Sequence, residues 1–145
     1  MQINLSLCLP RDEVTIPVAR HICRHALTDL GVDEDCRSDI EIALTEACAN
    51  VLKHSNSDEE YEIRVTVEND VCIIRVIDTG MGFDAANPPL LAQADDESGR
   101  GIAMMRALVD QVRLESKPEE GTVVHLEKRL GYAEQSVMRK LAARD

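Results

Sequence analysis

The pattern of apolar residues predicts strands in five segments of the chain. Residues 2–9 carry Ile or Leu at every second position, which predicts a strand with one buried face. Residues 61–68 and 71–78 are predicted to form two strands joined by a tight turn. Residues 111–117 and 122–130 are predicted to form a final hairpin. Residues 71–78 are apolar on both faces, so we expect this strand near the centre of the sheet.

A period near 3.6 residues replaces this alternation between the first and second strands. One helix is expected from about residue 15 to the stop signal Gly31, and a second from about residue 33 or 35 to residue 54. The apolar stripe expected on the first helix is Ala19, Ile22, Cys23, Ala26 and Leu30. The stripe expected on the second is Ile40, Leu44, Ala47 and Val51.

A glycine- and proline-rich stretch, residues 79–100, follows the central strand, and a third helix is expected at about 101–110. A loop of this length in a small domain is commonly functional. The last residues, 132–145, are expected to form a short amphipathic helix around Val137 and Leu141 or to fray. We predict one domain over 1–131, with 132–145 as a C-terminal tail.

The order of the elements predicts the fold class. A strand, two helices, two strands, a loop, a helix and two strands predict an α+β, two-layer sandwich. Its sheet is expected to be mixed and mainly antiparallel, with the helices on one face. The chain lacks the strand–helix alternation of a dinucleotide-binding domain and has no Walker A motif.

The charge and the cysteines narrow the function classes. A formal net charge of −11 disfavours direct binding of nucleic acid, because an acidic surface repels phosphate. The five cysteines include no C-x-x-C pair, which favours free thiols in the cytoplasm. Because no apolar run approaches the roughly 20 residues that cross a bilayer, we expect no membrane span.

The second predicted helix carries the first candidate for chemistry. Glu46, Asn50, Lys53 and His54 share one polar flank, since Asn50 lies about 40° around the helix from Glu46. Such a flank could supply a general base, a metal-ligating carbonyl and a phosphate-pairing amine. Taken alone, the cluster is also compatible with an ordinary solvated helix flank.

Two glycine-containing motifs follow. Asp78-Thr79-Gly80-Met81-Gly82 ends the central strand, where a carboxylate can accept a hydrogen bond from an exocyclic amine. Residues 98–104, Ser-Gly-Arg-Gly-Ile-Ala-Met, are read as the entry to a helix, whose free amides form an anion site. Alone, either motif could be a plain turn or a helix start.

Together, in this order and spacing, the three motifs resemble the N, G1 and G2 boxes of the GHKL ATPase superfamily. The resemblance covers residues 3 to 130 and implies the histidine-kinase-like ATPase fold. A free-standing domain of this length is most similar to the anti-sigma-factor serine/threonine kinases of the sporulation and general-stress type.

The resemblance implies a role for each matching residue. Glu46 would be the general base, and Asn50 would hold Mg²⁺ on the phosphates of ATP. Asp78, supported by Thr122, would bind the adenine amino group. The other nucleotide-binding positions implied are Lys53, His54, Gly80, Gly82, Gly99, Arg100, Gly101, Ile102, Ala103 and Met104, with residues 85–98 as the ATP lid.

The resemblance also implies protein partners. These are a sigma factor held by a homodimer of the kinase, and an anti-anti-sigma protein of the STAS type that the kinase phosphorylates. Arg20, on the first predicted helix, matches a position that this family presents to both partners; a solvated helix residue is the other interpretation.

One stretch departs from the family pattern. Related kinases usually place a basic residue just before the G2 glycines, but this chain reads Asp95-Asp96-Glu97-Ser98, and Arg100 is the nearest cation. Because acids repel a triphosphate, a second hypothesis stays open: a nucleotide-binding partner-switch module with little or no kinase activity. A third is an α+β interaction domain without a nucleotide.

Overall fold

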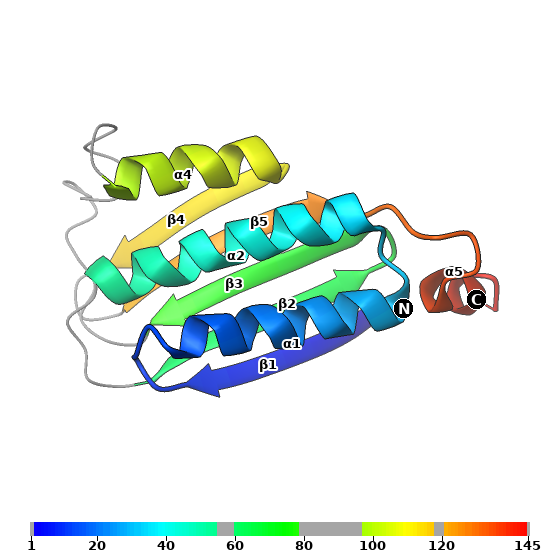
Figure 1. Ribbon diagram of the computed structural model, residues 1–145, viewed down its shortest axis with the longest axis horizontal. Helices are drawn as coiled ribbons and strands as arrows, with labels where there is room; N and C mark the ends of the chain where they lie inside the picture. The colour runs from blue at the N-terminus through cyan, green and yellow to red at the C-terminus, as the bar shows by residue number, and fades with distance from the viewer. Residues whose placement is uncertain (1, 55–59, 79–96, 118–120, 145) are drawn as a thin grey trace.

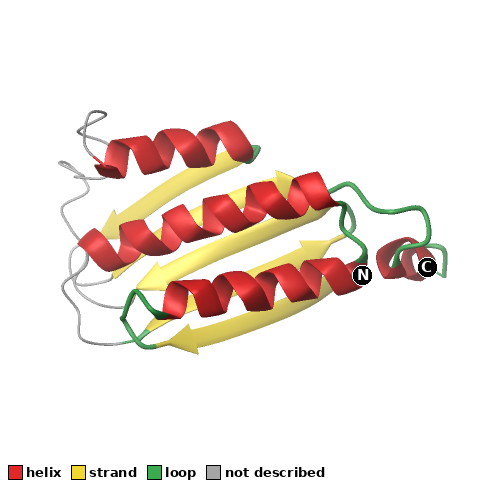
Figure 2. Ribbon diagram, in the orientation of Figure 1, coloured by secondary structure: helices red, strands yellow, loops and turns green. Residues whose placement is uncertain are grey.

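In the computed structural model, a layer of helices covers one face of a single sheet (Figure 1). The structure describes residues 2–54, 60–78, 97–117 and 121–144. Figure 2 shows the helices α1, α2 and α4 side by side on the same face of the sheet, with α5 past one end of the strands. The predicted two-layer α+β sandwich is therefore confirmed.

The sheet has five strands in the order β1-β2-β3-β5-β4. Their bounds are β1 Gln2–Leu9, β2 Tyr61–Glu68, β3 Val71–Asp78, β4 Gln111–Lys117 and β5 Gly121–Arg129. As predicted, β3 is central, and Asn69 makes the turn before it with a positive φ of 54°. All four pairings are antiparallel, so the expectation of a mixed sheet was wrong for the strands described.

Helix α1 spans Thr15–Leu30 and ends as predicted at Gly31, whose φ of 85° is the left-handed conformation that glycine favours. Its buried residues are Ile16, Ala19, Cys23 and Leu27. Ile22, expected in the buried stripe, is instead 37% exposed, because the helix turns its Ile16/Leu27 side toward the core. The sequence periodicity located the helix but placed its buried face slightly wrongly.

Helix α2 spans Glu34–His54 and lies across the middle of the sheet (Figure 1). It begins where the carboxylate of Asp33 accepts a hydrogen bond from the Cys36 amide, 3.0 Å away, as a helix N-cap does. Its predicted stripe is confirmed, since Ile40, Leu44, Ala47 and Val51 are all buried. Because this stripe packs on the sheet, the flank of α2 that carries Glu46 and Asn50 lies to one side of the core contact.

Helix α4 spans Glu97–Leu108 and thus begins four residues earlier than the predicted start at residue 101. Gly101 therefore lies inside the helix, where glycine is normally unfavourable and needs a packing reason.

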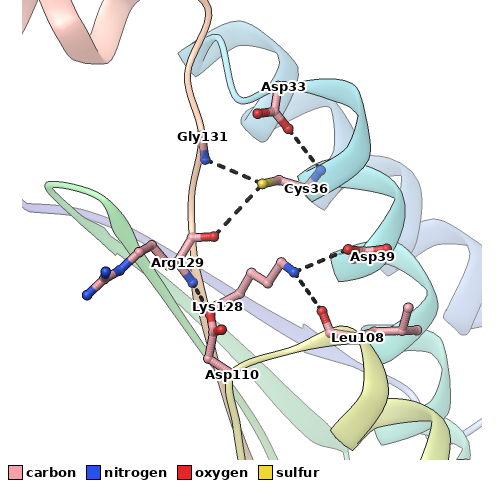
Figure 3. A network of polar contacts seen from close by, with 8 residues as sticks. All are labelled: Asp33, Cys36, Asp39, Leu108, Asp110, Lys128, Arg129 and Gly131. Atoms are coloured by element: carbon pink, nitrogen blue, oxygen red, sulfur yellow. Dashed lines mark hydrogen bonds and ion pairs between the residues drawn. The ribbon is translucent and has the colours of Figure 1, made fainter.

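A network of polar contacts joins α2, α4 and β5 at one end of the helix layer, and we call it the far-end network (Figure 3). Lys128 Nζ on β5 donates to Asp39 Oδ2 at 3.2 Å and to the Leu108 carbonyl at 2.7 Å. The amide of Gly131 donates to Cys36 Sγ at 3.4 Å, which attaches the chain after β5 to the start of α2. This end of the molecule is held by polar bonds as well as by the core.

The last helix, α5, spans Val137–Ala142, so the tail contains the expected short helix. It packs through Met138, which is buried, whereas Val137 is exposed. All five cysteines are free thiols, and Cys23 and Cys48 belong to the core as predicted. None of the described helices combines the length and apolarity needed to cross a bilayer.

Candidate functional site

The C-terminal half of α2 meets the first turns of α4 at the end of the molecule opposite the far-end network (Figure 1). A Cβ placed on Gly101 would lie 2.8 Å from Glu46 Oε2 and 3.6 Å from Asn50 Nδ2. Only glycine lets the two helices come this close without displacing Glu46. Glu46, Asn50 and Gly101, predicted from separate motifs, are therefore neighbours.

Asn50 is 4% exposed, and its Nδ2 has no hydrogen-bond partner among the residues that the structure describes. Leaving a buried amide donor unsatisfied costs about 1–3 kcal/mol, so such a group is seldom kept for stability. A side chain of this kind fits a site that binds a polar ligand.

Asp78 ends β3 and is fully buried on the helix-covered face of the sheet. In the strand register its direct neighbours are Tyr61 on β2 and Thr122 on β5. Thr122, which is buried too, therefore lies beside Asp78, although the two residues come from distant parts of the sequence.

Arg11 connects Asp78 to α2. Its Nε lies 3.3 Å from Asp78 Oδ2 in an ion pair whose side chains are 8% and 0% exposed. Its Nη2 donates to the carbonyls of Val51, at 3.4 Å, and Leu52, at 3.2 Å. Through Arg11, the end of the central strand is fixed against the same helix that carries Glu46 and Asn50.

Sequence reasoning missed Arg11. The residue lies in the short connection between β1 and α1, where Pro10 and Asp12 indicate only a turn. Its partners, Val51, Leu52 and Asp78, are far away in the sequence, so no local pattern predicts these contacts. The single available signal is a lone cation directly after an apolar strand.

The remaining predicted residues differ in how the structure presents them. Lys53 and Arg100 are exposed, and Ile102 is a core residue. His54 and Gly99 lie within α2 and α4, but only their backbone is described. Gly80, Gly82 and the expected lid as far as residue 96 lie outside the described residues.

The earlier start of α4 changes the interpretation of the amides of Ile102, Ala103 and Met104. Only the first four amides of a helix lack an intrahelical acceptor, and in α4 these precede Gly101. In this conformation the expected cradle of free amides at residues 102–104 is therefore not formed. The sequence pattern suggested it because a Gly-x-Gly pair usually precedes a helix rather than lying inside it.

A surface pocket of about 330 Å³ opens beside Glu46, between α1 and α2. Its lining residues are Arg20, Ser38, Glu41, Ile42, Thr45 and Glu46. Ile42 is 43% exposed, so the pocket has an apolar patch on its rim. The expected partner-contacting Arg20 and the expected general base therefore share one pocket.

The groups beneath the site are neutral. Burial raises the pKa of the Cys48 thiol to about 12. Burial also raises the pKa of Tyr61, whose hydroxyl lies 2.8 Å from Thr15 Oγ1. Neither group is therefore an anion near pH 7.

The site can be tested for its fit to a metal–nucleotide complex. Within the described part of the chain, no three His, Cys, Asp or Glu residues are grouped as a metal site. A divalent ion would therefore take oxygen ligands from the phosphates of the bound nucleotide and from the side-chain carbonyl of Asn50, as Mg²⁺ sites on nucleotides commonly do. The unsatisfied Nδ2 of the buried Asn50 can donate to a phosphate oxygen, and the side-chain carbonyl of the same residue is the atom that could ligate the ion, so Asn50 fits such a complex.

Comparisons with known proteins agree with this geometry. The family described as Histidine kinase-like ATPase domain matches residues 9–128. An anti-sigma F factor of Priestia megaterium is 34% identical in an alignment of 113 residues that covers 72% of this chain and 77% of the relative. The serine-protein kinase RsbW of Bacillus velezensis is 26% identical over 77% of this chain and 78% of its own.

Solved structures give the same fold. The RsbU and RsbW domains of a Mycobacterium tuberculosis protein match with a TM-score of 0.71 at 22% identity, covering 93% of this chain and 34% of that one. The mycobacterial sensor histidine kinase MprB matches with a TM-score of 0.54 at 15% identity, over 90% of this chain and 100% of that one. The resemblance drawn from the three motifs is thereby confirmed, and the chain belongs to the histidine kinase-like ATPase domain family, alongside the anti-sigma factors.

Proposed function

We propose that this chain is a cytoplasmic, ATP-binding anti-sigma factor and serine/threonine protein kinase. It would sequester a sigma factor and phosphorylate an anti-anti-sigma protein of the STAS type. The observation that carries the proposal is the meeting of Glu46, Asn50 and Gly101 where α2 and α4 approach each other. The relatives named anti-sigma F factor and serine-protein kinase support the same function.

The nucleotide half of the mechanism depends on the buried polar groups. Bound Mg²⁺–ATP would supply the phosphoryl group. Asp78, with Thr122 beside it, would accept a hydrogen bond from the adenine amino group. Asn50 would hold the magnesium ion, and Lys53, His54 and Arg100 would lie near the phosphates.

Glu46 is the proposed general base. It is half-buried and borders the pocket between α1 and α2, so a hydroxyl entering from outside can reach its carboxylate. By accepting the proton of a partner's serine or threonine, Glu46 would make that oxygen a better nucleophile. Gly101 would help by leaving room for the carboxylate.

The partner half of the mechanism depends on the pocket shared by Arg20 and Glu46. A STAS segment that contacts Arg20 and the apolar rim at Ile42 would bring its hydroxyl toward the base. We propose further that the protein acts as a homodimer on a sigma factor, without direct contact to nucleic acid or membrane. Sedimentation at several concentrations would test the dimer.

The second candidate function is a nucleotide-responsive partner switch with little phosphotransfer. The observation that favours it is the acid at the start of α4, Glu97, where relatives of this type are expected to carry a cation. A carboxylate near the phosphates would oppose the charge that develops during transfer.

Incubation with labelled Mg²⁺–ATP and the cognate STAS protein separates the two candidates. Replacement of the base in Glu46→Gln should lower phosphotransfer about a hundredfold or more, while nucleotide binding persists. Asp39→Asn is the matched control, because Asp39 lies on the same helix but pairs with Lys128 in the far-end network. This control should transfer phosphate at the unchanged rate.

The outcomes are distinct. Transfer that depends on Glu46 supports the kinase. Tight binding of nucleotide without transfer in the unmodified protein supports the partner switch. Failure to bind ATP or ADP in calorimetry would contradict both and favour a domain that binds only proteins.

A further inference from the structure

Arg11 occupies a place between the two halves of the proposed nucleotide site. Its guanidinium pairs with Asp78 Oδ2 at 3.3 Å and donates to the Leu52 carbonyl at 3.2 Å. We propose that Arg11 is a positioning residue that gives the site its selectivity for adenine, by holding the Asp78 carboxylate and the last turn of α2 in place. This inference rests on the proposed function, in which Asp78 binds the adenine ring of the nucleotide.

The first step concerns the carboxylate. An ionised aspartate only accepts hydrogen bonds, so an oriented Asp78 favours an exocyclic amine and disfavours a carbonyl oxygen at the same place. Adenine carries an amine there, whereas hypoxanthine carries a carbonyl. A carboxylate free to rotate would discriminate less, because selectivity of this kind needs a polar group fixed in one geometry. The buried ion pair with Arg11, whose side chain is 8% exposed, restricts the rotation of the Asp78 carboxylate.

The second step concerns the helix. The last four carbonyls of a helix have no intrahelical donor, and the C-terminus of a helix favours a cation. Arg11 Nη2 donates to two of these carbonyls, those of Val51 and Leu52. The same turn follows Asn50 and contains Lys53, so Arg11 also steadies the proposed phosphate-binding residues.

The shape of the side chain matters for both steps. A guanidinium has donors on several nitrogens in a rigid fork, and here Nε faces Asp78 while Nη2 faces α2. A lysine ammonium is a single point charge. Arg11→Lys should therefore keep the attraction to Asp78 but lose part of the double attachment.

The experiment compares the binding of ADP and inosine diphosphate, each with Mg²⁺, by calorimetry. The unmodified protein should prefer ADP by about ten- to hundredfold, the range of one hydrogen bond to a charged group. Arg11→Gln should lose most of this preference, mainly by weakening ADP, and Arg11→Lys should fall between the two. Arg64→Gln is the matched control, since the Arg64 side chain is 54% exposed and pairs with Glu62 on the face of the sheet without helices.

A readout without nucleotide separates this role from general stability. Hydrogen exchange of the amides in the last turn of α2 should be faster in Arg11→Gln, and unchanged in Arg64→Gln, at equal overall fold by circular dichroism. A second background, Asp78→Asn, keeps the test valid if Arg11→Gln does not fold. There Arg11→Lys should no longer change the ratio of ADP to inosine diphosphate binding, because two residues that act through one contact are not additive.

The results also distinguish this inference from the proposed function. A protein that prefers ADP, and keeps the same preference in Arg11→Gln or, if that variant is unfolded, in Arg11→Lys, would overturn the role of Arg11 and leave the function intact. A protein that binds neither nucleotide would overturn the function itself.

Discussion

The two ends of helix α2 use polar residues in different ways. At its start, Asp39 and Cys36 are joined to β5 and its continuation by the hydrogen bonds of the far-end network (Figure 3). Toward its end, Asn50 is buried with an amide nitrogen that has no partner in the described parts of the chain. Asp39 and Lys128 are partly exposed, whereas Asn50 is only 4% exposed, so the group without a partner is the one for which desolvation costs most.

The contrast shows where stability and function separate. In the far-end network the donors have acceptors, which stabilises the fold. An unsatisfied buried group lowers stability, and such groups are expected at functional sites. Gly101 shows the same division, because a helix-interior glycine lowers stability but makes room for Glu46. The start of α2 is held to the rest of the fold by the far-end network, whereas its last turns carry the groups that we propose bind a ligand.

The largest effect is expected from exchanging one polar residue for an apolar one at each end. Asn50→Leu should weaken Mg²⁺–ATP binding at least about tenfold, while the melting temperature stays equal or rises. Lys128→Met should do the reverse, lowering the free energy of unfolding by about 1–2 kcal/mol because it removes the donor to Asp39 and to Leu108.

Calorimetric titration and urea unfolding measure the two quantities on the same samples. The comparison fails if Asn50→Leu is clearly less stable than the unmodified protein, since Asn50 would then be structural. It fails equally if Lys128→Met weakens nucleotide binding at a temperature where it is folded.

A smaller effect on the proposed site, and a similar effect on stability, are expected from adding one methyl group at a glycine of each end. Gly31→Ala should lower stability by about 2 kcal/mol, because Gly31 has a φ of 85° and its Cβ would collide with Ser136. Gly101→Ala should be neutral or stabilising by up to about 1 kcal/mol, since alanine favours a helix and the flexible end of Glu46 can move aside. That displacement of Glu46 should slow phosphotransfer.

Thermal unfolding and a phosphotransfer assay would check the pair. Normal phosphotransfer in a folded Gly101→Ala protein would mean that the position of Glu46 beside α4 is unimportant.

The smallest effect is expected from the pH dependence of the far end. The hydrogen bond from the Cys36 amide lowers the pKa of Asp33 below its ordinary value of 3.8. A lowered pKa in the folded state contributes stability above pH 3.8, and this contribution is lost as the pH falls through the folded-state pKa. Asp33→Asn should therefore be slightly less stable near neutral pH and should approach the unmodified protein in acid; a constant difference at every pH would contradict this.

How much could be predicted from the sequence depends on the range of the interactions. The bounds of β2 and β3 and the buried stripe of α2 were predicted correctly, because a period of two or 3.6 residues is a local signal. The start of α4 was not, since the glycines at 99 and 101 locally disfavour a helix that begins at Glu97. The exposure of Ile22 was missed for a similar reason, as the rotation of α1 is set by what it packs against.

The candidate site divides in the same manner. Glu46, Asn50 and Asp78 were proposed from their types and spacing and remain predictions, whereas the family inferred from the same motifs is confirmed. The contact of Gly101 with Glu46 and Asn50, and the position of Thr122 beside Asp78, agree with the roles inferred for them, which remain to be tested. Arg11 was not found, because its partners are neighbours only after the sheet and α2 have packed.

Local patterns in the sequence were sufficient to predict most of the strands and helices and to show which residue types are available for binding a nucleotide. Packing was needed to show that the buried Asn50 Nδ2 has no hydrogen-bond partner among the described residues, that α4 approaches Glu46 at a glycine, and that Arg11 joins Asp78 to the end of α2. The physical reason is that periodicity and composition act over a few residues, whereas desolvation and ion pairing depend on segments that only packing brings together.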